Sequence, residues 1–194
     1  MPDKSLYVIA GCNGAGKTTA SFTILPDIID CPEFVNADEI ARGLSPFQPE
    51  TVALEAGRIM LARFQDLMSR HQSFAFETTL ATKSYAAKIA AAQRQGYTVT
   101  LLFFWLKNVA LAQERVKIRV AEGGHHIAPD VIERRYYRGI ENLFGTYLAL
   151  VDEAFIFDNS LGQPELMARK TLFGQLDILD NIEFAALRNC DENP

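Results

Sequence analysis

The glycine-rich segment at residues 11–18 constrains this chain more than any other part of its sequence. Its letters, GCNGAGKT, fit the pattern G-x-x-x-x-G-K-[ST] without a mismatch. A short apolar run, residues 6–10, precedes it, and a segment that can continue as a helix follows it. A glycine-rich loop with this pattern, between a strand and a helix, surrounds phosphates with backbone N–H groups at the positive end of the helix. The complete pattern and its flanking strand favour a P-loop that binds a nucleoside triphosphate over a turn that matches by chance.

The chemistry of a triphosphate assigns roles within this loop. Lys17 is expected to reach the β- and γ-phosphates, and the Thr18 hydroxyl to bind the Mg²⁺ that bridges them. Asn159 follows a later apolar run, where small-molecule kinases usually have their adenine-side loop, and we group it with the nucleotide contacts. The expected nucleotide-binding residues are Gly11, Asn13, Gly14, Ala15, Gly16, Lys17, Thr18, Thr19 and Asn159.

Composition limits the classes to which the protein can belong. With 194 residues, 48% of them apolar, and no Pro-, Gly- or Ser-rich linker, we expect a single domain over residues 1–194. The net charge of −5 argues against a nucleic-acid partner. Three cysteines without C-x-x-C spacing argue against a disulfide framework or a zinc site. We find no leader pattern and no apolar run that could span a bilayer, and we expect a cytoplasmic protein with no membrane partner.

Short apolar runs alternate with helical patterns along the chain, which indicates an α/β fold with a central parallel sheet covered by helices on both faces. Strands are expected at residues 6–10, 34–36, 73–76, 97–106, 155–157 and 166–172. Helices are expected at residues 17–25, 49–70, 83–94, 108–122, 129–150 and 177–188, with Pro26 ending the first. Asn108 is a candidate cap for the fourth helix.

Two acidic residues follow predicted strands at the edge where parallel sheets bind ligands. Asp38 follows the second strand, and Glu77 follows the third together with the hydroxyls of Thr78 and Thr79. A carboxylate here can hold Mg²⁺ through water or accept the proton of an attacking hydroxyl. For Asp38 the alternative is a helix N-cap, because it precedes a segment that can start a helix.

A basic segment at residues 115–138 is the third candidate. It holds six basic and three acidic side chains, and Arg115 and Arg119 share one face of a predicted helix because they are four residues apart. With the Gly123-Gly124 pair and Arg134, this pattern indicates a helical lid that neutralises charge on transferring phosphoryl oxygens. For Lys117 and Arg138 we prefer a solvated helix face. His125 and His126 in the glycine-rich loop indicate contact with solvent or substrate, and we predict no metal there.

The chain resembles the zeta toxin family of P-loop kinases. The resemblance covers about residues 5–172 and rests on the P-loop, the block at residues 36–40 (NADEI), the block at residues 76–80 (FETTL), and the lid with its arginines and Gly-Gly-His sequence. It implies a nucleoside-monophosphate-kinase-like fold and transfer of the γ-phosphoryl of ATP or GTP to a hydroxyl of UDP-N-acetylglucosamine or another UDP-sugar.

The same resemblance implies roles for individual residues. Asp38 matches the catalytic base, and Glu77 and Thr79 match substrate-contacting positions. Arg115 or Arg119, with Arg134, match the phosphate-stabilising arginines. We add Thr78 and His125 to the expected substrate contacts, and an antitoxin protein is a possible partner.

Two other functions fit the same sequence. One is a P-loop phosphotransferase for another small hydroxyl compound, such as an antibiotic or a nucleoside. The other is a regulatory module that binds ATP and transfers nothing. Asp38 discriminates between enzyme and module, because a binding module does not need a base directed at an acceptor.

Overall fold

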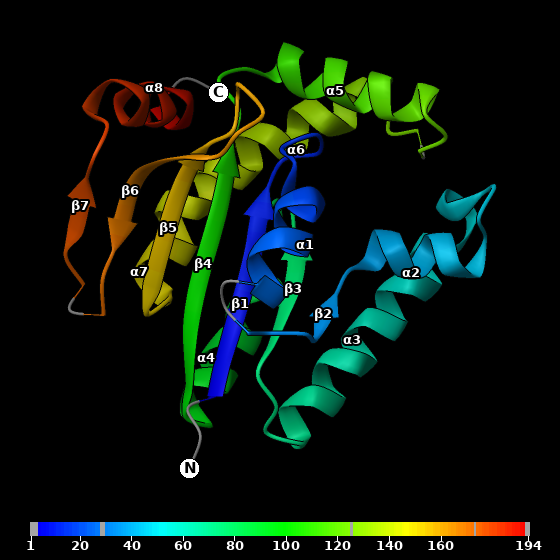
Figure 1. Cartoon of the computed structure of the whole chain (residues 1–194), viewed down its shortest axis with the longest axis horizontal. Helices are drawn as coiled ribbons and strands as arrows, with labels where there is room; N and C mark the ends of the chain where they lie inside the picture. The colour runs from blue at the N-terminus through cyan, green and yellow to red at the C-terminus, as the bar shows by residue number, and fades with distance from the viewer. Residues whose placement is uncertain (1–3, 28–29, 125, 173, 193–194) are drawn as a thin grey trace.

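One mixed sheet of seven strands forms the centre of the described molecule (Figure 1). The computed structural model describes residues 4–27, 30–124, 126–172 and 174–192. The strand order is β2-β3-β1-β4-β5-β6-β7. Strands β1 to β5 pair in parallel, and β6 and β7 are added antiparallel. The strands are β1 Lys4–Gly11, β2 Phe34–Val35, β3 Phe74–Thr78, β4 Tyr97–Trp105, β5 Glu153–Asp158, β6 Glu165–Lys170 and β7 Leu176–Ile178.

Strands β1 and β4 form the buried centre of this sheet. Leu101, Leu102 and Phe103 of β4 are all buried although consecutive side chains point to opposite faces, as a strand covered on both faces requires. In the register, Ala10 of β1 lies beside Phe103 of β4 on one side and Thr78 of β3 on the other. The P-loop and the residues after β3 therefore leave the sheet at the same edge.

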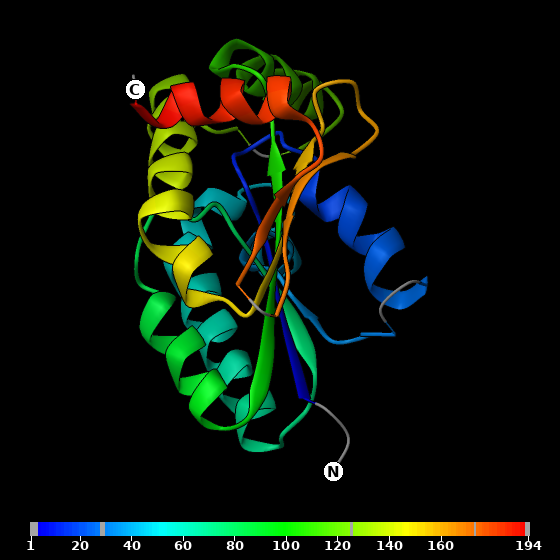
Figure 2. The same cartoon turned by 90° about the vertical axis from the view of Figure 1, so that its left-hand side faces the viewer.

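Helices cover both faces of the sheet. Figure 2 shows α1 on one side, and α4, α6 and α7 on the other. The α2–α3 pair stands beside the β2 edge, and α5 lies above the carboxyl ends of the strands (Figure 1). The helices are α1 Lys17–Asp27, α2 Ala37–Leu44, α3 Ala53–Ser69, α4 Ala86–Arg94, α5 Val109–Ala121, α6 Pro129–Asn142, α7 Leu148–Leu150 and α8 Asn181–Glu192. A 3-10 turn, Pro49–Val52, precedes α3, and a π turn, Leu143–Tyr147, joins α6 to α7.

The predicted α/β fold is confirmed, with three corrections. The sheet is not wholly parallel, because the connection between β5 and β6 is too short for a crossover and makes a hairpin instead. Residues 176–178 form β7, and the last helix begins only at Asn181. Helix α1 continues past Pro26 to Asp27. Asn108 does cap α5, since its Oδ1 accepts a hydrogen bond from Leu111 N.

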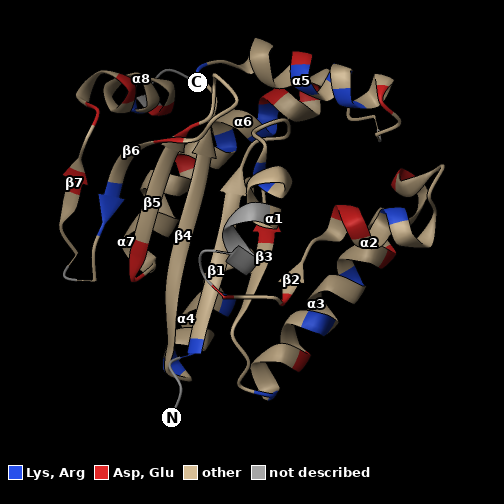
Figure 3. Cartoon of the chain, in the orientation of Figure 1, with Lys and Arg blue, Asp and Glu red and all other residues tan. Residues whose placement is uncertain are grey.

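Charge is distributed unevenly over these elements. Few charged residues lie on the central strands, whereas α2, α3 and α5 carry both signs (Figure 3). None of the helices in the described part of the chain has the length and apolar character needed to cross a membrane. The charged elements α2 and α5 flank the sheet edge that holds the P-loop.

Candidate active site

The P-loop is held in place by close contacts with two distant segments. Gly14 has φ of +81°, and a Cβ there would lie 2.7 Å from the carbonyl oxygen of Ala112 in α5. Gly16 has φ of +79°, and a Cβ there would lie 2.5 Å from Asn159 Nδ2. These backbone conformations and contacts require glycine. The glycines thus let both α5 and the loop after β5 approach the P-loop backbone.

Lys17 is buried within this loop, with only 6% of its surface exposed. Its Nζ donates to the carbonyl oxygen of Cys12 at 2.9 Å and lies 3.5 Å from Glu77 Oε1. A buried ammonium needs such partners, because desolvation of an unpaired charge is costly. The lysine also lines the central cavity. Its charge is therefore already placed at the predicted phosphate position.

Glu77 joins three elements at the floor of the cavity. Its Oε2 accepts from the Thr18 hydroxyl and from Asn36 Nδ2, each at 2.8 Å. A carboxylate beside the P-loop hydroxyl matches the oxygen-rich setting in which Mg²⁺ is bound through one or two protein oxygens, waters and phosphates. No group of three or more His, Cys, Asp or Glu side chains in the described ranges could hold a metal alone. Thr18 and Glu77 are thus the residues that fit a nucleotide-bound Mg²⁺.

Asp38 does not cap α2, so that alternative is wrong. The cap is Asn36, whose Oδ1 accepts from Asp38 N at 2.8 Å and from Glu39 N at 3.4 Å. Asp38 lies in the first turn, where a negative charge is favoured by the helix dipole. Its carboxylate is exposed and lines the central cavity opposite the P-loop. Asn36 is a site residue whose role our sequence analysis missed, although an Asn before a helix is a cap signal.

Arg115 and Arg119 of α5 both line the central cavity, as their spacing predicts. Arg115 Nη2 donates to the carbonyl oxygen of Ser160 at 2.8 Å, which ties α5 to the loop after β5. Arg119 differs, because its Nε and Nη2 are buried and have no hydrogen-bond partner among the described residues. Buried guanidinium donors are costly to leave unpaired. An anion such as a phosphoryl group would satisfy them.

The structure separates Arg134 from the site and brings Arg135 into it. Arg134 lines a different cavity, next to Tyr137 and Asp191. Arg135 Nη1 donates to Asn13 Oδ1 of the P-loop at 3.1 Å. Burial lowers the pKa of Arg135 from its usual value, and the charge of Asp38 acts in the opposite direction. Consecutive helix residues point about 100° apart. Arg134 and Arg135 therefore lie on different faces of α6, and Arg135 is the one that faces the P-loop.

A second cavity of about 480 Å³ lies on the other side of the P-loop. Asn159 lines it, but the Nδ2 of this residue donates to Ala15 O at 2.8 Å. Asn159 therefore fixes the P-loop itself, in addition to lining this cavity. The lining is largely apolar and consists of Gly14, Gly16, Thr19, Ala20, Arg115, Phe157, Asn159, Gly162 and Pro164.

A third cavity of about 290 Å³ lies behind Asp38 and Glu77. Its wall carries a group of hydroxyls from Thr78, Thr79, Thr82 and Ser84, together with Arg135. The loop that carries them is fixed from behind, because Asn142 Nδ2 donates to Leu80 O and the Tyr147 hydroxyl donates to Thr82 O, both at 2.7 Å. The π turn that precedes α7 therefore helps to shape this polar inner cavity.

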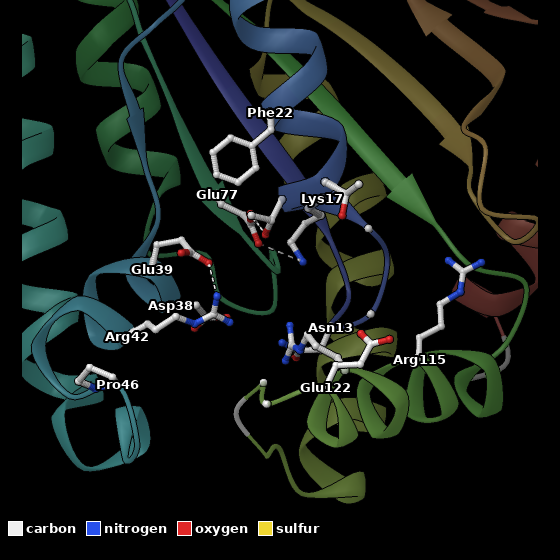
Figure 4. Close-up of a pocket in the computed structure, with 17 residues that line it drawn as sticks. Asn13, Lys17, Phe22, Asp38, Glu39, Arg42, Pro46, Glu77, Arg115 and Glu122 are labelled. Carbon is white, nitrogen blue, oxygen red and sulfur yellow. Dashed lines mark hydrogen bonds and ion pairs between the residues drawn. The ribbon is translucent and has the colours of Figure 1, made fainter.

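Figure 4 shows the central cavity between these parts, with the P-loop and α1 on one side and α2 on the other. Its volume is about 930 Å³. Gly123 and Gly124, which follow α5, also line it. His126 lines a separate outer cavity with Phe47, and His125 lies outside the described residues. The cavity thus joins a phosphate-binding loop to an exposed carboxylate.

Comparison of the sequence with known proteins gives a family and a relative. The profile of the family described as "Zeta toxin" matches residues 2–160. An uncharacterized protein of Haemophilus influenzae is 31% identical over 137 residues, which cover 70% of this chain and 94% of that protein.

Solved structures of low sequence identity share the fold. A chain of the AvrRxo1-ORF1:AvrRxo1-ORF2 complex with sulphate ions has a TM-score of 0.79 at 13% identity, and the match covers 95% of this chain. The present chain spans 63% of that chain. The structure of the PezAT chromosomal toxin-antitoxin system of Streptococcus pneumoniae gives a TM-score of 0.64 at 15% identity, over 99% of this chain and 86% of that chain. Another AvrRxo1 structure, with ATP, gives 0.76 at 14% identity.

Proposed function

The chain belongs to the zeta toxin family, and on that premise we propose that it transfers the γ-phosphoryl group of ATP to a hydroxyl of a UDP-activated sugar such as UDP-N-acetylglucosamine. One observation carries the proposal. The exposed Asp38 carboxylate and the buried Lys17 ammonium line the same cavity from opposite walls. That arrangement lets an acceptor hydroxyl and a γ-phosphoryl group meet between a base and a cation.

The proposed reaction is an in-line displacement in which the residues have separate tasks. The acceptor oxygen attacks the γ-phosphorus while its proton moves to an Asp38 carboxylate oxygen. The bond from the γ-phosphorus to the bridging oxygen breaks, and ADP takes the electron pair. Lys17 and Arg119 stabilise the charge on the transferring and leaving oxygens. Mg²⁺, which Thr18 and Glu77 would hold, would supply further charge neutralisation when bound.

We assign Arg135 rather than Arg134 to the phosphate-facing arginines. Arg135 reaches the P-loop through Asn13 and is near enough to Asp38 to sense its charge. Burial lowers the pKa of Arg135 from its usual value, and a guanidinium nevertheless keeps its positive charge in proteins. It can therefore stabilise the triphosphate at the end of the P-loop that Asn13 occupies.

A second candidate acceptor is a small free polyol. The inner cavity favours it, because the threonine and serine hydroxyls that line this cavity offer hydrogen-bond partners to several hydroxyl groups of a ligand. In either case the lid at about residues 115–138 is proposed to close over the phosphates. A protein antitoxin is a proposed partner, on the likeness to a toxin-antitoxin structure.

Incubation of the protein with γ-labelled ATP, Mg²⁺ and a panel of acceptors tests the proposed function. The panel holds UDP-N-acetylglucosamine, other UDP-sugars, free N-acetylglucosamine, nucleosides and aminoglycosides. We expect labelled UDP-sugar phosphate as the main product. Label that appears only in a free sugar would select the polyol kinase, and label in no organic product would contradict a kinase of small hydroxyl compounds.

A further inference from the structure

The turn at residues 78–82, here called the threonine turn, has a backbone conformation that its sequence does not favour. Leu80 at its centre has φ of +55°, in the left-handed region that residues other than glycine rarely adopt. Its side chain is fully buried, so packing contacts occupy the space around it. Such conformations persist only where the surroundings hold them, and they are frequent at functional sites. The contacts that hold this turn are therefore of interest for the chemistry beside it.

The conformation of Leu80 determines where two hydroxyls of the inner cavity lie. Leu80 N donates to Thr78 Oγ1 at 3.1 Å, and Ala81 N donates to Thr79 Oγ1 at 3.4 Å. A hydroxyl that accepts one hydrogen bond can still donate its proton to a ligand. Both threonines line the inner cavity. A change in the turn would thus move groups that an acceptor can contact.

Helix α6 contacts the back of the threonine turn at two points. A Cβ on Gly139 would lie 2.7 Å from the carbonyl oxygen of Thr79, so the helix and the turn approach each other backbone to backbone. Asn142 is buried, and its Nδ2 donates to the carbonyl oxygen of Leu80 at 2.7 Å. The residue with the unusual φ is therefore bonded directly to the end of α6.

The same face of α6 also reaches the P-loop. Arg135, Gly139 and Asn142 are spaced by four and three residues, which places them on one face of the helix. Arg135 Nη1 donates to Asn13 Oδ1 at 3.1 Å. Seven residues advance a helix by about 10 Å. One rigid helix face thus connects the P-loop to the threonine turn.

The π turn after α6 adds a third contact with the threonine turn. In an α-helix, Tyr147 would point about 140° away from Asn142, because it is five residues further on. The π turn Leu143–Tyr147 holds more residues per turn, which rotates Tyr147 back towards that face. The buried Tyr147 hydroxyl donates to Thr82 O at 2.7 Å.

We propose that Asn142 and Tyr147 are positioning residues, which hold the threonine turn at a fixed distance from the P-loop and so place the acceptor for attack. This inference rests on the proposed function. Neither residue lines the central or the inner cavity, so both act through the turn. Phosphoryl transfer needs the acceptor oxygen in line with the γ-phosphorus, and a misplacement of about 1 Å can cost a hundredfold in rate. Without these bonds Leu80 relaxes and the hydroxyls of the turn leave their places.

Hydrogen exchange of the threonine turn tests this hold without any acceptor. Tyr147→Phe removes one hydroxyl and keeps the buried ring. Tyr97→Phe is the matched control, because the buried Tyr97 donates to Gln72 O at 2.9 Å, at the opposite end of the sheet. Both variants should lose similar amounts in Tm. Only Tyr147→Phe should speed exchange of the Leu80 and Ala81 amides, by about three- to tenfold. Equal exchange of these amides in the two variants would overturn the inference.

Kinetics with an acceptor tests the consequence for transfer. Tyr147→Phe and Asn142→Ala should lower kcat/KM for the acceptor about ten- to a hundredfold, whereas Tyr97→Phe should not. The affinity for a non-hydrolysable ATP analogue should stay within about twofold of wild type in all three, because none of these residues lines the central cavity or the second cavity.

A pair of glycine variants gives an independent test that removes no hydrogen bond. Gly139→Ala places a methyl group against Thr79 O, so the turn must shift. Gly57→Ala in α3 is the control, because a Cβ there meets nothing within 4 Å. Both changes favour a helix. Only Gly139→Ala should lower kcat/KM for the acceptor, and equal values in the two variants would contradict the inference.

The outcomes separate this inference from the proposed function. Faster exchange of the turn in Tyr147→Phe, with no transfer by the wild type to any acceptor, would support the hold on the turn and contradict the kinase. Transfer with equal acceptor kcat/KM in Tyr147→Phe and Tyr97→Phe would support the kinase and contradict the inference. Both stand if Tyr147→Phe alone of this pair loses acceptor kcat/KM while its ATP affinity is unchanged.

Discussion

The two walls of the central cavity differ in how completely their polar groups are already paired. On the P-loop wall, Lys17 is bound to Cys12 and Glu77, and Ala15 is bound to Asn159. On the walls from α2 and α5, Asp38 is exposed and Arg119 has buried donors without a partner in the described part of the chain. The polar groups of the P-loop wall are therefore already paired, whereas the walls from α2 and α5 carry polar groups that a ligand would pair.

This difference suits an enzyme that binds one kind of donor and a particular acceptor. Phosphate recognition depends on backbone N–H groups, which must be fixed by glycines and distant contacts. Acceptor recognition, on the proposed function, would depend on side chains such as Asp38, which can be exchanged without loss of the fold. Changes on the two walls should therefore have different consequences for binding, catalysis and stability.

Replacement of the buried Lys17 is the strongest test of the P-loop wall. Lys17→Ala removes the cation from the predicted phosphate position, and we expect transfer to fall at least about a thousandfold with weaker ATP binding. Steady-state rates and ATP titration measure both effects, and thermal unfolding controls for folding. Turnover and ATP affinity equal to those of wild type would refute the P-loop assignment.

Two arginine variants compare a residue that lines the central cavity with one that lies outside it. Arg119→Ala should lower kcat on the order of a hundredfold, because one charge-stabilising donor is lost. Arg134→Ala serves as the matched control and should change kcat by less than about threefold, since Arg134 faces another cavity. An equal loss of activity in both variants would contradict the placement of Arg119 in the site and of Arg134 outside it.

Hydrogen exchange can sharpen the contrast between the walls. The segment that joins α5 to α6 should exchange about tenfold more slowly once the ATP analogue is bound, because Arg119 then gains an anion. Backbone amides of the P-loop should already be protected where they are hydrogen-bonded, as Ala15 N is to Cys12 O. Exchange in the joining segment that is slow without ligands and unaltered by them would argue against a lid.

The rate at which Cys12 is alkylated reports on the rigidity of the P-loop. It is the smallest of the predicted effects. Burial raises the pKa of Cys12 from its ordinary value of 9.0 to about 11. The buried neutral thiol thus contributes stability that is complete below pH 9 and is lost as the pH rises through about 11. Alkylation at pH 8, followed by mass spectrometry, should modify the half-buried Cys190 before Cys12. Faster modification of Cys12 would mean that the P-loop opens.

Local signals in the sequence predicted the P-loop and the positions of two carboxylates beside it. The P-loop pattern is contiguous, and Asp38 and Glu77 could be placed because parallel strands end at one edge. The choice between Arg134 and Arg135 depends on the rotation of α6 about its axis, which a run of basic residues does not define. The contact of Asn159 with Ala15 joins residues 144 positions apart, and no local pattern encodes such a pairing.

The most direct test of the account is single-turnover transfer by Asp38→Asn, with Asp130→Asn as the matched control. Asp130 occupies the first turn of α6 as Asp38 does that of α2, so both changes remove the same charge from a helix start. Each should reduce stability by no more than about 1 kcal/mol. We predict that Asp38→Asn binds ATP normally and transfers phosphoryl about a hundred- to ten-thousandfold more slowly, while Asp130→Asn stays within about threefold of wild type. A folded Asp38→Asn protein that transfers at the wild-type rate would contradict the assignment of Asp38 as the base.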